Sequence, residues 1–165
     1  MSKINFKKIF LNFITILIIF LTDRISKLYI LKIAELENKV DIYITSYLNL
    51  YLIWNKGIAF GMLSFSESFI YNIVSVIIVA ITSVILVMII KNEGPKKYYL
   101  LLVFGGSLGN LFDRIYFSAV PDFIDFHINN FHWFIFNVAD IFITIGIVCL
   151  ILNEIFINKK NEKIN

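Results

Sequence analysis

Residues 68–90 read SFIYNIVSVIIVAITSVILVMII, a run without a single charged side chain. A helix needs about 20 consecutive apolar residues to cross roughly 30 Å of hydrocarbon, so this run predicts a membrane-spanning helix. The rest of the chain agrees with it, because 59% of the 165 residues are hydrophobic and the mean hydropathy is +0.81. A soluble domain of this length is only about half apolar. We therefore interpret residues 1–165 as a single membrane domain.

Three further apolar runs lie on either side of this one. The first extends over about residues 9–30, with Asp23 in its last third, the next over 98–114, and the last over 134–157. Lysines precede the first run, as in a cleaved signal peptide, but no small-residue cleavage site follows it, so we expect an uncleaved helix. The sequence therefore predicts a membrane all-α fold, a bundle of four transmembrane helices.

The lysines indicate the direction of these spans. They form three short clusters, before the first span, between the second and third, and after the fourth. With four spans, all three clusters lie on one side, which the positive-inside rule identifies as cytoplasmic. Both termini are then cytoplasmic, and residues 31–67 and 114–133 face outward. The lysines are Lys3, Lys7, Lys8, Lys91, Lys96, Lys97, Lys159, Lys160 and Lys163.

The outward connection before residue 68 has a different pattern. Residues 40–54, VDIYITSYLNLYLIW, are rich in β-branched and aromatic residues with partial alternation, which is typical of short strands. We expect a small β-sheet over about residues 37–60, lying on the outer surface. Trp54 and Trp133 also fall in outward connections, where tryptophan suits the membrane interface.

Four aspartates lie at a similar depth in this arrangement. Asp23 is near the outer end of the first span, and Asp113 is at the outer end of the third. Asp122 follows in the outer connection, and Asp140 is near the outer start of the fourth span. An ionisable group within a span is costly unless it is paired or functional. The sequence therefore predicts a polar site near the outer face of the membrane.

Helix contacts should bring two of these acids together. Gly105 and Gly109 form a small-xxx-small pattern, which permits close helix approach, and we expect the third span to contact the fourth through it. Asp122 would then lie beside Asp140. Two carboxylates in a low-dielectric site can share a proton, as aspartic proteases require. The fourth span also carries one polar face, formed by Asn137, Asp140 and Thr144.

Five motifs along the chain resemble, in order and spacing, those of the bacterial lipoprotein signal peptidase family, also called signal peptidase II. The resemblance covers residues 9–157. It implies an aspartic endopeptidase of the bacterial cytoplasmic membrane that removes signal peptides from prolipoproteins, cleaving before a diacylglyceryl-modified cysteine. It also implies inhibition by globomycin. The motifs are DRISK (23–27), NKGIAF (55–60), GGSLGNLFDR (105–114), VPDFIDF (120–126) and FNVAD (136–140).

The resemblance also implies roles for individual residues. Asp122 and Asp140 match the catalytic pair, and Asp23 and Lys27 match a first-span motif whose role looks structural. We interpret Asp113 as structural as well. We expect no metal, no cofactor and no nucleic-acid partner, and we expect a monomer that contacts membrane lipid. The polar residues that match the surroundings of the catalytic pair are Asn55, Asn110, Arg114 and Asn137. Departures from the usual family residues are Arg24, Ile58, Pro121 and Ile141.

Less specific interpretations exist for several of these side chains. Asp140 could be a capping acid at a helix start, and Asp122 could be an ordinary loop acid. Asp125 should point away from Asp122 in an extended segment, as a solvated or structural acid. We interpret His127 and His132 as interfacial residues rather than ligands.

Other functional classes fit the sequence less well. GGSLG matches the G-x-S-x-G nucleophile pattern, but it lies within a span and lacks the required strand–turn–helix context. A metalloprotease would need H-E-x-x-H, which the sequence lacks. A transporter would space its acids through the membrane, whereas these gather on one side. A non-catalytic assembly factor that uses the acids only for packing remains the other alternative.

Overall fold

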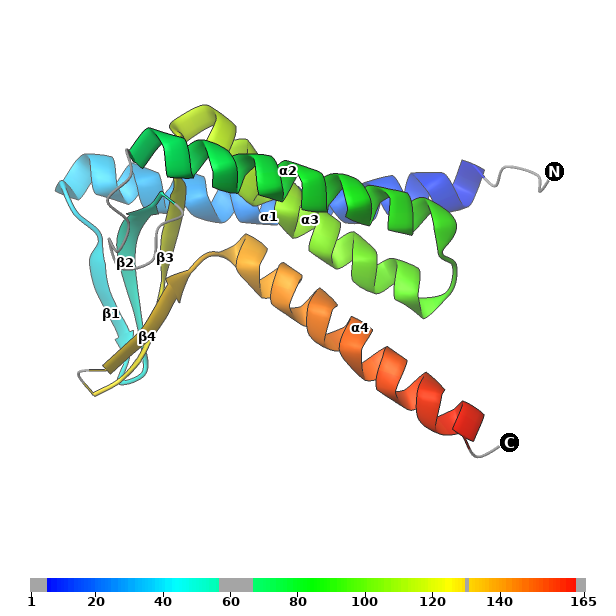
Figure 1. The fold of residues 1–165 in the computed structure, drawn as a ribbon. Coiled ribbons are helices and arrows are strands. Elements are labelled where there is room, and N and C mark those ends of the chain that lie inside the picture. The colour runs from blue at the N-terminus through cyan, green and yellow to red at the C-terminus, as the bar shows by residue number, and fades with distance from the viewer. Residues whose placement is uncertain (1–5, 57–66, 130, 163–165) are drawn as a thin grey trace.

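The computed structural model describes residues 6–56, 67–129 and 131–162, which form four long helices and one four-stranded sheet. Figure 1 shows the sheet at one end of the helices, with the first turn of α1 and the last turn of α4 at the other end. The helices are α1 (Phe6–Glu37), α2 (Glu67–Lys91), α3 (Pro95–Phe117) and α4 (Val138–Glu162).

Three of the described helices are long and apolar enough to cross a membrane. They are α1, the Tyr71–Lys91 part of α2 and the Val138–Phe156 part of α4. Helix α3 has the length but carries two lysines in its first turn and Asp113 and Arg114 near its end. The protein is therefore a membrane protein with three candidate spans, and composition alone does not confirm the predicted fourth.

The helix bounds differ from the predicted ones at two places. Helix α1 continues past residue 30 to Glu37, so at 1.5 Å per residue it is about 48 Å long, more than the hydrocarbon thickness. Helix α4 begins at Val138 rather than at residue 134. Residues 134–136 were predicted to be helical, which is wrong, because they complete a strand. This strand, β4 (Phe131–Phe136), leads directly from the sheet into α4.

The sheet is antiparallel with the order β1-β2-β3-β4. The first two strands confirm the predicted β segment as far as Asn55, and residues 57–60 of that prediction lie outside the described residues. The last two strands were not predicted. They lie where we expected a loop and the start of the fourth span. The strands are β1 (Asp41–Thr45), β2 (Leu48–Asn55), β3 (Val120–Ile128) and β4 (Phe131–Phe136).

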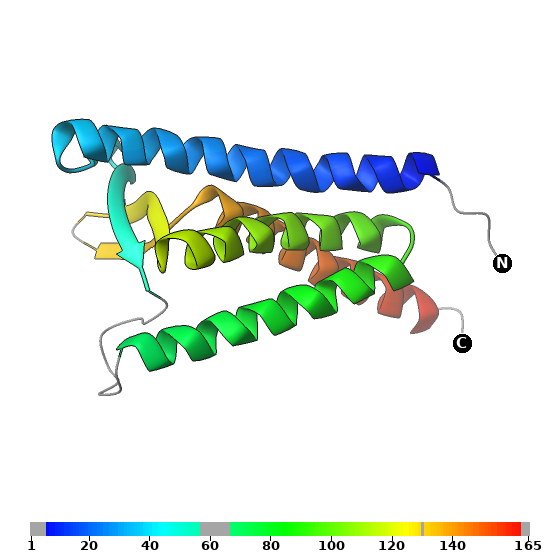
Figure 2. The ribbon, with the colours of Figure 1, turned by 90° about the horizontal axis from the view of Figure 1, so that it is seen from above.

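Helix α3 lies between α1 and α2 (Figure 2), and glycines let it approach α1 closely. A Cβ on Gly105 would be 2.9 Å from Ile19, and a Cβ on Gly109 would be 2.5 Å from Asp23 Oδ2. Gly105 thus faces α1, whereas a Cβ on Gly109 would also lie 3.5 Å from the Ala139 side chain of α4. The predicted contact between α3 and α4 is therefore present at Gly109, and the same glycine pattern also brings α3 against α1.

A further glycine on each helix lets α3 and α4 approach more closely. A Cβ on Gly106 would be 2.5 Å from the carbonyl oxygen of Ala139, in the first turn of α4. Further along α4, a Cβ on Gly146 would be 2.7 Å from the carbonyl oxygen of Tyr99. The backbones of α3 and α4 are therefore in close contact at both points. Helix α3 lies against both α1 and α4, so polar residues of all three helices can meet.

Candidate active site

Asp122 lies in β3 with both carboxylate oxygens hydrogen-bonded. Asn55 donates from Nδ2 to Oδ2 at 2.9 Å, and Asn137 donates from Nδ2 to Oδ1 at 2.6 Å. The register of β2 and β3 explains the first contact, because Ile53 pairs with Asp122 and Asn55 with Val120. The side chain is buried. Two amides from separate segments therefore fix this carboxylate.

Asn137 and Asp140 form the start of α4 as a reciprocal pair. The Asp140 backbone N–H donates to Asn137 Oδ1 at 3.2 Å, and the Asn137 backbone N–H donates to Asp140 Oδ2 at 3.1 Å. This arrangement is a capping box, which satisfies two backbone N–H groups at a helix start. The capping role considered for Asp140 is therefore present in the structure. Because Asn137 also donates to Asp122, one residue joins the two acids.

Asn110 of α3 holds the other oxygen of Asp140. Its Nδ2 donates to Asp140 Oδ1 at 2.8 Å, while its Oδ1 accepts from Lys27 Nζ at 3.0 Å. The lysine thus determines which way the amide faces, since the ammonium can only donate. The structure therefore brings the predicted residues Asn55, Asn110 and Asn137 into contact with the two aspartates.

A buried ion cluster lies behind Asn110, between α1 and α3. Lys27 Nζ donates to Asp23 at 2.9 Å and to Asp113 at 2.6 Å. Arg24 lies 3.2 Å from Asp23 and 2.5 Å from Asp113. Two acids and two bases balance in charge, as buried ions must. Asp23 also accepts from the Ala139 backbone at 3.0 Å, which joins the cluster to the first turn of α4.

Burial raises the pKa of the Asp122 carboxyl to about 6. Hydrogen bonds from Asn55 and Asn137 act against this by stabilising the ionised form, and the nearby charge of Asp140 raises the pKa further. A carboxyl with such a pKa exchanges its proton close to neutral pH. It can therefore act in general acid–base chemistry.

Arg114 was predicted to hold the acid pair or the substrate. In the structure its guanidinium lies 5.9 Å from the centre of the Tyr71 ring, and the Tyr71 hydroxyl donates to the Arg114 carbonyl oxygen. Within the described residues, Nε and one terminal nitrogen of Arg114 are buried without a hydrogen-bond partner. The structure thus places Arg114 with free donors, but not in contact with either aspartate.

An apolar cavity of about 510 Å³ lies beside Asp140, between β4 and α4. Phe134 and Phe136 line it from the strand, and Ile141 and Thr144 from the helix. Thr144 thus shares a face with Asp140 as predicted, and that face opens into the cavity. The cavity therefore joins an ionisable group to a surface that suits hydrocarbon.

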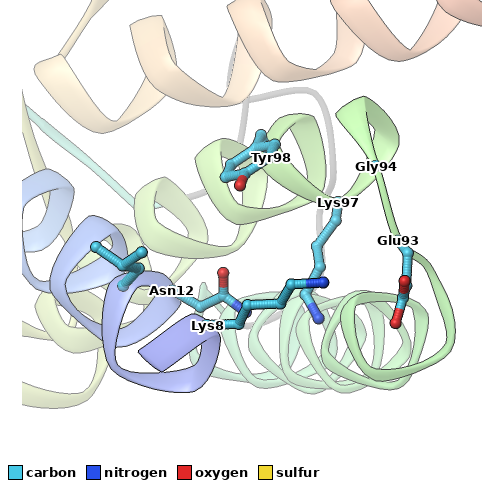
Figure 3. Close-up of a pocket in the computed structure, with 7 residues that line it drawn as sticks. Lys8, Asn12, Glu93, Gly94, Lys97 and Tyr98 are labelled. Carbon is cyan, nitrogen blue, oxygen red and sulfur yellow. The ribbon is translucent and has the colours of Figure 1, made fainter. Parts of the chain in front are cut away.

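A second cavity, of about 200 Å³, lies far from the aspartates, where the start of α1 meets the α2–α3 turn. In Figure 3 the side chains of Lys8 and Lys97 extend toward one another, with Glu93 on the turn nearby. This end of the bundle is basic. The two cavities therefore differ in chemistry, one being apolar with an acid and the other cationic.

Asp125 was predicted to be a solvated or structural acid, and the structure excludes the solvated alternative. It is buried, and its carboxylate lies 2.8 Å from Nδ1 of His132 and 3.6 Å from Nδ1 of His127. His127 is also buried within the protein, whereas the His132 side chain is exposed. Together these three residues could hold a metal ion. Sequence spacing missed this group, because it depends on how β3 pairs with β4.

The family departures are accommodated in distinct ways. Arg24 belongs to the ion cluster and lies over the Phe112 ring at 4.9 Å. Pro121 pairs with β2 only, because β4 begins to pair with β3 at Ile124. The proline therefore lacks a backbone N–H at a position where no β4 residue needs one for the sheet. Ile141 lines the apolar cavity. Ile58 lies outside the described residues.

The sequence matches a known protein family and several of its members. The family profile described as Signal peptidase (SPase) II matches residues 15–156. The chain belongs to the signal peptidase II family. It is 57% identical to the lipoprotein signal peptidase of Pelagibacter ubique (strain HTCC1062), over 99% of both chains. It is 37% identical to that of Anaplasma phagocytophilum (strain HZ), over 96% of this chain and 99% of the relative.

A solved structure of a bacterial membrane enzyme has the same fold as this signal peptidase II. It aligns with a TM-score of 0.68 at 26% identity, covering 86% of this chain and 90% of the other. These likenesses confirm the family expected from the five motifs. They make the chain a membrane peptidase that removes signal peptides from lipoproteins.

Proposed function

We propose that this signal peptidase II is an aspartic endopeptidase that cleaves prolipoproteins before a diacylglyceryl-modified cysteine, with Asp122 and Asp140 as its catalytic pair. The observation that carries the proposal is that Asn137 hydrogen-bonds both acids, although they come from a strand and a helix. The pKa of Asp122, near 6, supports the same reading, because one acid of such a pair must be protonated at working pH.

The chemistry follows from the two carboxyl groups. The ionised aspartate takes a proton from a water molecule while the water oxygen attacks the scissile carbonyl carbon. The protonated aspartate donates its proton to the carbonyl oxygen. Collapse of the tetrahedral intermediate returns a proton to the leaving amine and breaks the C–N bond. Asn55, Asn110 and Asn137 hold the carboxylates in place, so little reorganisation accompanies the proton transfers.

The apolar cavity beside Asp140 is the proposed entry for substrate. Its aromatic and aliphatic walls suit either acyl chains or the apolar part of a signal peptide, and both approach from the bilayer. Arg114 has donors available for a substrate carbonyl. Ile141 lines the cavity next to Asp140, so it is placed to affect which side chains fit. Globomycin-type inhibitors would occupy the same space.

For the membrane arrangement we propose four spans in the bacterial cytoplasmic membrane, with α3 as the fourth. The basic end with Lys8 and Lys97 would face the cytoplasm, where positive charge gathers. The sheet and both aspartates would then lie near the outer face, with both termini cytoplasmic. We propose that residues 1–165 form one domain that works as a monomer.

The test is cleavage of a purified diacylglyceryl-modified prolipoprotein in detergent, without added metal. Wild type should cleave it, and Asp122→Asn and Asp140→Asn should not, although both should remain folded by circular dichroism. Asp41→Asn, an exposed aspartate on the same sheet, is the matched control and should cleave normally. Cleavage by a folded Asp140→Asn or Asp122→Asn protein at the wild-type rate would overturn the catalytic assignment.

A further inference from the structure

The hairpin of β3 and β4 carries both histidines of the chain. His127 and His132 are cross-strand partners, so their side chains lie on the same face of the sheet. Asp125 is two residues before His127 on the same strand, and alternation places it on that face as well. Pairing of the two strands thus gathers one carboxylate and two imidazoles at one point.

Their nitrogen and oxygen atoms converge. His132 Nδ1 lies 2.8 Å and 3.0 Å from the two carboxylate oxygens of Asp125, and His127 Nδ1 lies 3.6 Å from Oδ2. One ligand atom from each of the three residues falls within 4.8 Å of the others. The imidazole rings face one another, with centres 5.2 Å apart. Both rings therefore direct Nδ1 toward the same carboxylate.

The cluster is buried on one side and open on the other. Asp125 is 2% and His127 8% exposed, whereas the His132 side chain is 55% exposed. Within the described residues, His127 Nδ1 is buried and makes no hydrogen bond. Asn49, the partner of Asp125 on β2, has a buried Oδ1 without a hydrogen-bond partner in the same set. Buried polar atoms without partners are costly, so a missing ligand is indicated.

A hollow of about 370 Å³ adjoins the cluster, lined by Asn49, Tyr51, Asp125, His132 and Ile135 among others. It provides a path from solvent to the carboxylate. It also provides room for a water molecule or a further oxygen ligand. The cluster therefore has an entry and an open coordination position, which a simple ion pair between Asp125 and His132 does not need.

We propose that Asp125, His127 and His132 bind a divalent transition-metal ion, with Zn²⁺ the best match. Two imidazoles and a carboxylate are donors that Zn²⁺ accepts, at about 2.0–2.2 Å from the metal. Ligand atoms in a tetrahedral site at such distances are ~3.3 Å apart. The nitrogen–oxygen distances of 2.8 Å and 3.6 Å fall on either side of this value.

The ion would connect β3 to β4 beyond their backbone hydrogen bonds. Asp122 lies on β3, and Asn137 directly follows β4, so both strands lead to the proposed active site. The metal's role is structural, since the cluster holds none of the residues assigned to peptide cleavage. Zn²⁺ binding by this cluster and peptide cleavage by the aspartates can therefore be tested independently.

The test is metal binding by the full-length protein in detergent, purified without a histidine tag and freed of metal with a chelator. Calorimetric titration with Zn²⁺ should show one ion per chain. Titration with Co²⁺ should give the visible d–d absorption of Co²⁺ bound by four or five ligands rather than by six water molecules. Because the chain has two histidines and both are in the cluster, metal coordination by imidazole nitrogen reports this site alone.

Variants separate the site from other acids on the surface. His132→Gln should weaken Zn²⁺ binding at least tenfold; because His132 also contacts the buried Asp125, each variant's own metal-free unfolding temperature serves as its reference. Asp125→Asn should weaken Zn²⁺ binding similarly. Glu37→Gln, an exposed acid at the end of α1, should bind as wild type does.

Two outcomes would overturn the proposal. One is a wild-type protein that binds no Zn²⁺ at micromolar concentration. The other is equal binding by wild type and His132→Gln, which would place the ion on other surface acids. If Zn²⁺ binds as expected, it should also raise the unfolding temperature of wild type and not that of His132→Gln.

Discussion

Lys27 is the buried ammonium on which the polar interior depends. Its Nζ donates at 2.9 Å to Asp23, at 2.6 Å to Asp113 and at 3.0 Å to Asn110. Lys27→Met keeps the length of the side chain and removes the charge. Two buried carboxylates would then face Arg24 alone, which leaves one uncompensated negative charge. Removing one partner of a buried ion pair costs about 3–5 kcal/mol, so we expect the free energy of unfolding to fall by this amount.

The matched control is Lys39→Met. Lys39 donates to Asp41 at 3.0 Å, nearly the same distance, but these side chains are 74% and 48% exposed. Solvent screens such a pair, and its loss should cost about 0–1 kcal/mol. Unfolding of both variants by SDS in mixed micelles, followed by circular dichroism, measures the difference. Equal destabilisation by the two variants would refute the reasoning that burial sets the value of these ion pairs.

A double variant tests whether charge balance is the cause. Lys27→Met with Asp113→Leu leaves Asp23 opposite Arg24, so the cluster is neutral again. We expect it to be more stable than Lys27→Met alone, since a buried pair can be replaced by apolar groups at little cost. A double variant that is less stable than the single one would show that hydrogen-bond geometry, rather than net charge, dominates.

Three further results are expected. Gly109→Ala would place a Cβ 2.5 Å from Asp23 Oδ2; SDS unfolding should show a loss of about 1–3 kcal/mol. Tyr71→Phe removes the hydroxyl that donates to Arg114, and should lower the free energy of unfolding by about 1 kcal/mol. The folded pKa of Asp122, about 6, exceeds its ordinary value of 3.8, so the folded state binds the proton more tightly. The free energy of unfolding should therefore fall as pH rises from about 4 to about 6, and Asp122→Asn should lack this fall.

Much of the helical part was predictable because hydrophobic runs reveal burial in lipid. The charge-free run at 68–90 became α2 almost to the residue. The i,i+4 spacing of Asp23 and Lys27 identified their ion pair before the structure did. The contribution of Arg24 was not predictable from spacing, because its partner Asp113 lies on another helix.

The sheet shows where pattern reasoning is weakest. Residues 134–136, FIF, are apolar and lie just before an apolar helix, so they were assigned to the span, and residues 131–133 were assigned to the outer connection. Their strand exists because β3 is there to pair with them, a tertiary effect that local sequence does not reveal. The same register brings His132 to Asp125. Contacts that depend on strand pairing were therefore not predicted.

The capping box at the start of α4 determines when the proposed active site can form during synthesis of the protein. Asp140 is oriented by the backbone of the helix turn that it helps to begin, and that helix is the last one described along the chain. A nascent chain in which α4 has not yet formed has no ordered second carboxylate. With Asp140 as the proposed second catalytic acid, the peptidase would become active only when α4 assembles, and the unfinished chain would need no separate activation step to stay inactive.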